Sequence, residues 1–173
     1  MKKLLQFAGL ISLALGVVAF ILFMATPAIV LSSGNTQYIY KGTVALFGSK
    51  EAVSVIGINL GTIETKPSIL ALIGWILLII GIIIVCLGVV LPLLKVKALD
   101  KYAGILNLVA VCALVAAGIL LFCSRAAFCS ANNWDTDGAN LGAGWVIAGI
   151  LSILGGVCAV LPAAVAFVGG KKK

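Results

Sequence analysis

The sequence predicts an all-α integral membrane protein in which four transmembrane helices form a left-handed bundle of two tandem hairpins. Three observations support this class. Hydrophobic residues make up 63% of the 173 residues and charged residues 10%, so the apolar surface is too large for a soluble domain to bury. Four uncharged apolar runs each reach the ~20 residues that a helix needs to cross a bilayer. Small residues recur at seven-residue spacing in every run.

The predicted spans cover residues 4–31, 68–94, 102–123 and 141–168 of a single membrane domain, 1–173. Two outer loops, 32–67 and 124–140, and an inner loop, 95–101, connect them. A Gly-Trp pair opens residues 74–92 and a Leu-Pro pair closes them, and the same pairs bracket residues 144–162. This internal repeat indicates that one two-helix hairpin is used twice.

Basic residues predict the orientation, because they gather in cytoplasmic loops. One side of the four-span arrangement carries Lys2, Lys3, Lys95, Lys97, Lys101 and Lys171 to Lys173. On the other side, acidic residues balance the basic ones. We therefore expect a multi-pass protein of a bacterial plasma membrane with both termini in the cytoplasm. The first span is longer than the ~7–15 residues of a signal-peptide core, which predicts an uncleaved helix.

The recurring small residues define a packing stripe on each helix, because residues seven apart stay on nearly the same face. Removing bulk there lets helix backbones approach closely in lipid. The predicted packing residues are Gly9, Gly16, Gly74, Gly81, Gly88, Ala103, Ala110, Ala117, Gly142, Gly149 and Gly156. The sequence leaves open which stripes face a neighbour in the same chain and which face another copy.

No Asp, Glu, Lys, Arg or His lies in any predicted span. Pumps, proton relays and most ion-coupled transporters use an ionisable residue within the membrane, so these classes are disfavoured. A tightly packed bundle also disfavours a pore through one protomer. Any pathway would then run between protomers.

The first outer loop contains two segments rich in β-branched and aromatic residues, 37–47 and 52–60, with turn residues at 48–51. They predict an extracellular β-hairpin. Its edge could recruit another copy by strand addition, or the hairpin could cover the bundle as a lid. The candidate interaction residues are Tyr38, Tyr40, Val44, Leu46 and Phe47.

The second outer loop offers a candidate disulfide and a partial calcium motif. Cys123 and Cys129 are close in sequence on the expected oxidising side, which favours a bridge. Asn133, Asp135 and Asp137 alternate as in a calcium loop, but Gly144 stands where such a loop places its bidentate Glu. We therefore favour a turn rich in Asn and Asp that caps the fourth helix, and expect no metal and no cofactor.

The cysteines within the spans and the tryptophans near the span ends are also expected to have structural roles. The remaining cysteines lie within the spans and are expected to pack as small apolar side chains. Trp75, Trp134 and Trp145 stand near predicted span ends, where indole rings anchor helices at the membrane interface.

The layout of four spans, inward termini and a long β-containing first outer loop resembles the claudin and peripheral-myelin-protein group. The first-loop signature of that group needs Trp and Cys, and residues 32–67 contain neither, so the resemblance does not imply a junction-forming role. Residues 1–95 also resemble small bacterial four-helix membrane proteins of unassigned function. The shared features are Tyr40-Lys41-Gly42 and Phe47-Gly48.

These features favour a non-catalytic membrane protein that acts as a self-assembling scaffold or as an accessory subunit of a larger membrane complex. The expected partners are the lipid bilayer and either further copies or another membrane protein, and not nucleic acid. One alternative is an oligomeric channel or facilitator with a pathway between protomers. A second alternative is a membrane enzyme of thiol-redox or lipid-modifying type.

Overall fold

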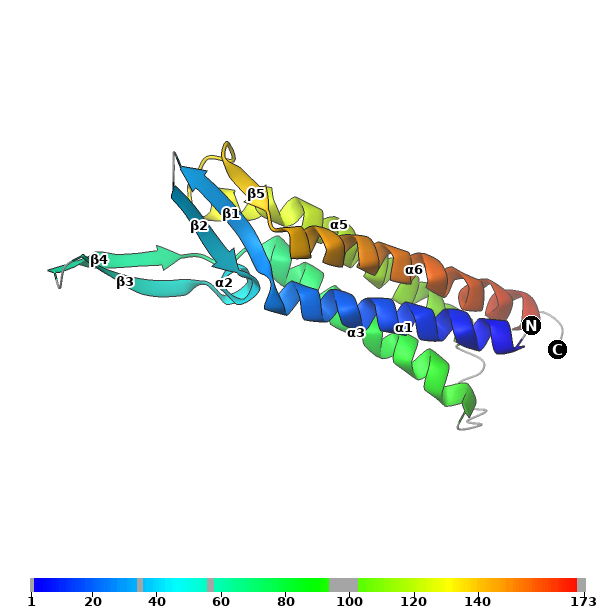
Figure 1. Cartoon of the computed structure of the whole chain (residues 1–173). Coiled ribbons are helices and arrows are strands. Elements are labelled where there is room, and N and C mark those ends of the chain that lie inside the picture. Colours follow the sequence, from blue (N-terminus) through cyan, green and yellow to red (C-terminus); the bar gives the residue numbers. More distant parts are fainter. Residues whose placement is uncertain (1, 34–35, 56–57, 94–102, 171–173) are drawn as a thin grey trace.

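The computed structural model describes residues 2–33, 36–55, 58–93 and 103–170, and four long helices dominate it (Figure 1). They are α1 (Lys2–Ala25), α3 (Ile69–Leu93), α5 (Ala103–Ala131) and α6 (Ala143–Gly170). Each contains an apolar stretch of 19 to 28 residues, long enough to span a membrane. The predicted inner loop, 95–101, lies outside the described residues.

The strands lie at one end of the helix bundle, which we call the sheet end (Figure 1). The first turn of α1 and the last turn of α6 lie at the opposite end. Helix α1 packs against α3 and α6, and α5 packs against the same two helices. The contact between α1 and α3 is the least extensive of the four, so each helix of the first hairpin packs mainly against the second hairpin.

The small-residue stripes of α1 and α3 face other helices of the same chain. A Cβ atom added to Gly16 of α1 would lie 3.0 Å from Ile82 of α3. A Cβ atom added to Gly81 of α3 would lie 2.7 Å from Leu114 of α5, and one on Gly88 would lie 2.8 Å from the Asn107 side-chain oxygen. Gly9 faces Val89, and Gly74 faces Leu120.

The stripes of α5 and α6 also pack within the chain. Ala110 and Ala117 of α5 are fully buried, whereas the side chain of Ala103, the first residue of that helix, lies outside the described part of the structure. A Cβ atom on Gly149 of α6 would lie 3.0 Å from Phe122, and one on Gly156 would lie 2.7 Å from Val115. Gly142 precedes α6 and packs against the Pro27 carbonyl. The close packing for which the stripes are suited therefore occurs inside one protomer.

Two buried serines add hydrogen bonds between these helices. The Ser12 hydroxyl of α1 donates to the Gly155 carbonyl of α6 at 2.7 Å, and the Ser152 hydroxyl of α6 donates to the Leu114 carbonyl of α5 at 2.7 Å. Both hydroxyls are buried, so each would lack a partner if its helix shifted. These bonds fix the position of α6 relative to α1 and α5.

Two separate sheets form at the sheet end. Strands β1 (Pro27–Ser33), β2 (Thr36–Lys41) and β5 (Ala139–Leu141) form an antiparallel sheet in the order β2-β1-β5. Strands β3 (Ser49–Val55) and β4 (Ile58–Thr65) form an antiparallel hairpin. Because β5 comes from the second outer loop, the pairing of β1 with β2 and β5 connects the two outer loops. The sequence pattern gave no indication of this connection.

The first outer loop therefore contains a β-hairpin, β3–β4, but the predicted pairing of residues 37–47 with 52–60 is wrong. Residues Gly42–Phe47 form the short helix α2, and residues 49–51 of the predicted turn begin β3. Tyr38 and Tyr40 lie on a strand as expected, but Val44, Leu46 and Phe47 lie on α2. Ala45 and Leu46 are buried in the core, and this tertiary packing outweighs the β-propensity of the segment.

Two helix boundaries also differ from the prediction. Helix α1 ends at Ala25 instead of residue 31, because Pro27 has no N–H and disfavours helical geometry in the residue before it. Helix α5 continues to Ala131 instead of ending at residue 123. The first difference creates β1, and the second places both cysteines of the predicted disulfide on a helix.

We predict that Gly118→Ala destabilises the protein by about 1–3 kcal/mol, the usual cost of overpacking. A Cβ atom there would lie 2.7 Å from the Gly149 carbonyl oxygen, and backbone atoms cannot move aside unless α5 and α6 separate. Thermal unfolding in detergent should show a lower Tm. The matched control is Gly74→Ala, whose Cβ atom would make an ordinary 3.4 Å contact and should leave the Tm unchanged or raise it. Equal effects at both positions would contradict this packing.

Candidate functional site

The end of α1 and the start of α6 meet at the sheet end through an aromatic contact. Phe23 and Trp145 are fully buried, and their rings stack with centroids 4.3 Å apart and planes inclined by 17°. The Trp145 indole N–H donates to the Phe23 carbonyl at 2.9 Å. In an uninterrupted helix this carbonyl would accept from residue 27, but residue 27 is a proline, so the indole supplies the missing donor.

Glycines allow three backbone segments to converge around this contact. A Cβ atom on Gly42 would overlap the Phe23 carbonyl and lie 3.3 Å from Trp145 Nε1. A Cβ atom on Gly144 would overlap the Thr26 side chain. The predicted interfacial role is therefore wrong for Trp145, which forms part of the core instead.

A second aromatic cluster connects β2 to the second outer loop. Tyr40, Phe128 and Trp134 form three ring contacts, with centroids 5.2 to 5.7 Å apart. Tyr40 comes from β2 and Phe128 from the last turns of α5, so the cluster holds the sheet against the end of the bundle. The sequence offered no signal for this cluster, because Tyr40 lies far along the chain from Phe128 and Trp134.

The Asn132 side chain joins the two outer loops. Its side-chain oxygen accepts from the Lys66 backbone N–H at 2.7 Å, and its side-chain nitrogen donates to the Lys66 carbonyl at 3.1 Å. The Asn132 amide thereby makes the same two hydrogen bonds to the Lys66 backbone that a residue of a neighbouring antiparallel strand would make. It fixes the segment between β4 and α3 to the end of α5.

The partial calcium motif forms a hydrogen-bonded turn. The Asp135 carboxylate accepts from the Asp137 backbone N–H at 3.2 Å, and Asn133 takes a left-handed conformation with φ of 54°. Arg125 donates to the Thr136 carbonyl at 2.9 Å. The turn leads into β5 and does not cap α6 directly. Among the described residues, no group of three or more His, Cys, Asp or Glu side chains could hold a metal ion.

The predicted disulfide is not formed, because Cys123 and Cys129 are free thiols on the same helix. Six residues of α-helix rise about 9 Å, and a disulfide joins Cα atoms about 4.4–6.8 Å apart. Cys123 is exposed and Cys129 is buried. A bridge would require α5 to unwind over its last turns.

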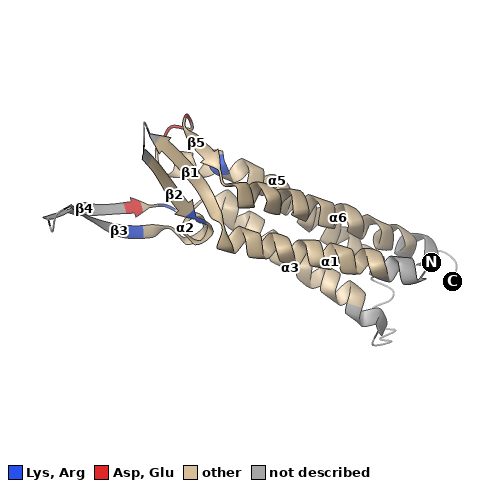
Figure 2. Cartoon of the chain, viewed as in Figure 1, with Lys and Arg blue, Asp and Glu red and all other residues tan. Residues whose placement is uncertain are grey.

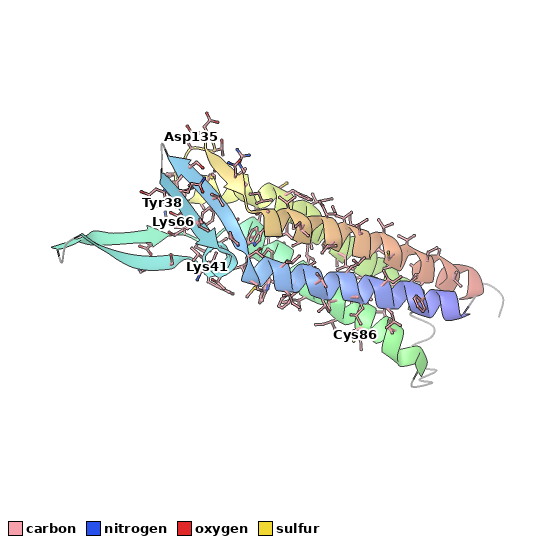
Figure 3. All side chains as sticks on the ribbon, in the orientation of Figure 1. Tyr38, Lys41, Lys66, Cys86 and Asp135 are labelled. Atoms are coloured by element: carbon pink, nitrogen blue, oxygen red, sulfur yellow. The ribbon has the colours of Figure 1, made fainter. Side chains whose placement is uncertain are left out.

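Among described side chains, the charged residues cluster at the sheet end (Figure 2). They are Lys41, Lys50, Glu64, Lys66, Arg125, Asp135 and Asp137. Lys50 and Glu64 face each other across the β3–β4 hairpin and form an exposed ion pair of 3.1 Å. Figure 3 shows Tyr38, Lys41, Lys66 and Asp135 together at this end. Lys95, Lys97, Lys101 and Lys171 to Lys173 lie outside the described residues.

Large apolar side chains are exposed at the sheet end beside these charges. Tyr38, Ile39 and Phe47 are 54%, 60% and 61% exposed. Sequence reasoning identified Tyr38 and Phe47 but missed Ile39, which falls on the opposite face of the strand from Tyr38. This end therefore combines charged, aromatic and aliphatic groups, whereas the exposed faces of the long helices are mainly Ile, Leu and Val.

The chain is therefore a bundle of four helices that are apolar enough to span a membrane, with small antiparallel sheets at one end. No protein-family model matches the chain, and no curated protein matches it.

We predict that Trp145→Phe lowers the free energy of unfolding by about 1–3 kcal/mol, because it keeps the stacked ring but leaves the buried Phe23 carbonyl without its indole donor. The matched control is Trp75→Phe. The Trp75 indole nitrogen is buried and has no hydrogen-bond partner among the described residues. Removing this N–H by Trp75→Phe should therefore change the free energy of unfolding little. Thermal unfolding of both variants measures the difference, and a larger loss for Trp75→Phe would contradict this assignment.

We predict that a variant retaining only Cys123 and Cys129 contains two free thiols. A membrane-permeant maleimide should label Cys123 in the folded protein, because only this thiol is exposed. Denaturation without reductant should then add a second label, measured by intact mass. If the denatured protein takes up label only after reduction, Cys123 and Cys129 are bridged, and α5 cannot be a continuous helix between them.

Proposed function

We propose that this chain is a multi-pass membrane protein that acts as a non-catalytic, self-assembling scaffold. The proposal rests chiefly on one contrast. The small residues suited to helix association are used inside the protomer, while exposed aromatic and aliphatic side chains gather at the sheet end. Exposed apolar groups beside charged ones are typical of protein interaction sites.

The proposed orientation places the sheet end outside the cell and both termini in the cytoplasm. The lysines of the sequence support it, because only Asp100 opposes the eight lysines near the termini and in the inner loop, as expected of cytoplasmic segments. In the outer loops and the segments beside them, four acidic residues balance four basic ones, and Lys50 and Glu64 form an ion pair. The expected location is the plasma membrane of a bacterium.

The bundle interior supports a structural role. Leu78, Leu114 and Leu121 are fully buried between the helices, and glycine contacts close the remaining space. Side chains therefore fill the centre of the protomer. Any solute pathway would have to run between copies, as in the alternative of an oligomeric channel.

We predict that the purified protein in native-lipid nanodiscs gives particles with the mass of a discrete assembly of several copies. Native mass spectrometry or mass photometry would measure it. Empty nanodiscs provide the mass reference, and a scaffold should give no ion flux in proteoliposomes above a lipid-only control. Particles with a single copy would contradict self-assembly and favour an accessory subunit of another membrane complex.

A further inference from the structure

The outer edge of β2 is the least protected part of the sheet. In the sheet order β2-β1-β5, β1 is central and β2 and β5 form the edges. Proteins protect edge strands by shortness, proline, bulges or inward charges. Strand β5 has only three residues, but β2 has six, contains no proline, and pairs with β1 in regular register from Thr36 to Tyr40. Its one charged residue is Lys41, at the end of the strand.

No strand among the described residues pairs with this outer edge, and the two residues at the middle of β2 expose large apolar side chains beside it. Tyr38 and Ile39 are adjacent, so they project from opposite faces of the sheet, and both are more than half exposed. The edge therefore presents backbone N–H and C=O groups flanked by apolar surface on both faces. An extended segment of another chain fits this chemistry.

The protein's own β3–β4 hairpin forms a separate sheet and does not pair with this edge. Gly48 enters it with φ of 75°, a conformation that side-chain-bearing residues rarely adopt, and its N–H donates to the Val44 carbonyl at 2.8 Å. After the hairpin, Lys66 is held by Asn132, and the Ser68 N–H donates to the Ala45 carbonyl at 2.8 Å. Figure 1 shows the hairpin projecting from the bundle as a separate element.

We infer that β2 pairs antiparallel with β2 of a second copy, so that the two sheets become one continuous sheet. Two identical strands related by a two-fold axis perpendicular to their sheet place residues of the same face opposite each other. With Ile39 opposite Ile39, Tyr38 faces Tyr40 and Gln37 faces Lys41 across the axis. Aliphatic, aromatic and polar positions each meet a compatible partner, and no like charges oppose each other.

This inference rests on the proposed self-assembly and specifies its contact surface. Figure 1 shows β2 on the side of the sheet away from α5 and α6, so the pairing does not require the helices of two copies to touch. Assembly through β2 and assembly through helix faces therefore respond to different substitutions.

The test uses charge reversal at Ile39, where the two-fold axis brings one residue against itself. Ile39→Lys and Ile39→Glu, each alone, should place like charges opposite each other and weaken association at least about tenfold. Differently tagged Ile39→Lys and Ile39→Glu chains, mixed before reconstitution, should assemble together again. Particle mass in nanodiscs and co-purification of the two tags measure these results.

The control variant is Thr43→Lys, which adds the same charge at an exposed position of α2, outside the residues 37–41 that pair in the proposed sheet. It should assemble as the unmodified protein does, and the Tm of each variant reports its folding. Unchanged assembly of both Ile39 variants would overturn the β2 pairing but leave self-assembly standing. If each Ile39 variant alone fails to assemble and the mixed Ile39→Lys and Ile39→Glu chains also fail, the β2 pairing is overturned as well. A single-copy particle from the unmodified chain would overturn the proposed function itself.

Discussion

The Phe23 carbonyl lacks a donor from its own helix, because Pro27 stands four residues later without an N–H. Trp145 supplies that donor from the first turn of α6, and its ring stacks on Phe23. The end of α1 is thereby tied to the start of α6. Strand β1 leaves one of these helix ends and β5 enters the other, so the pairing of the strands depends on the same junction. The closely packed glycines around it leave little room for another arrangement.

The helix bundle and the sheet end expose different kinds of surface. The bundle is filled by its own small and aliphatic side chains, and its described outer faces offer mainly Ile, Leu and Val to the surroundings. Apolar contacts of this kind are non-directional, so these faces discriminate poorly between binding partners. The sheet end combines backbone edges, aromatic rings and paired charges, which can distinguish one partner from another. Recognition is therefore proposed for this end, and the bundle holds it in place.

The sequence predicted the four helices and their packing residues because both depend on local periodicity. A glycine every seven residues identifies a helix face whichever helix comes to lie on it. The sheet end was predicted poorly because it depends on contacts between distant segments. Residues 42–47 have strand-forming side chains but become helical where Ala45 and Leu46 enter the core. The pairing of β1 with β5, the role of Trp145 and the Asn132 contact with Lys66 have no local signal, and the spacing of Cys123 and Cys129 indicated a bridge only while the end of α5 was misplaced.

The order of helix contacts bears on how the protein is made. Helix α1 packs mainly against α6, and α3 mainly against α5, while α1 and α3 contact each other least. Because synthesis proceeds from the N-terminus, the first two long helices are made before their main packing partners exist. The glycine face of α3 has no partner until α5 has been made, and the edge of β1 that pairs with β5 has none until the second outer loop has been made. A chain made only as far as α3 would therefore expose packing surface to chaperones or to a neighbouring nascent chain.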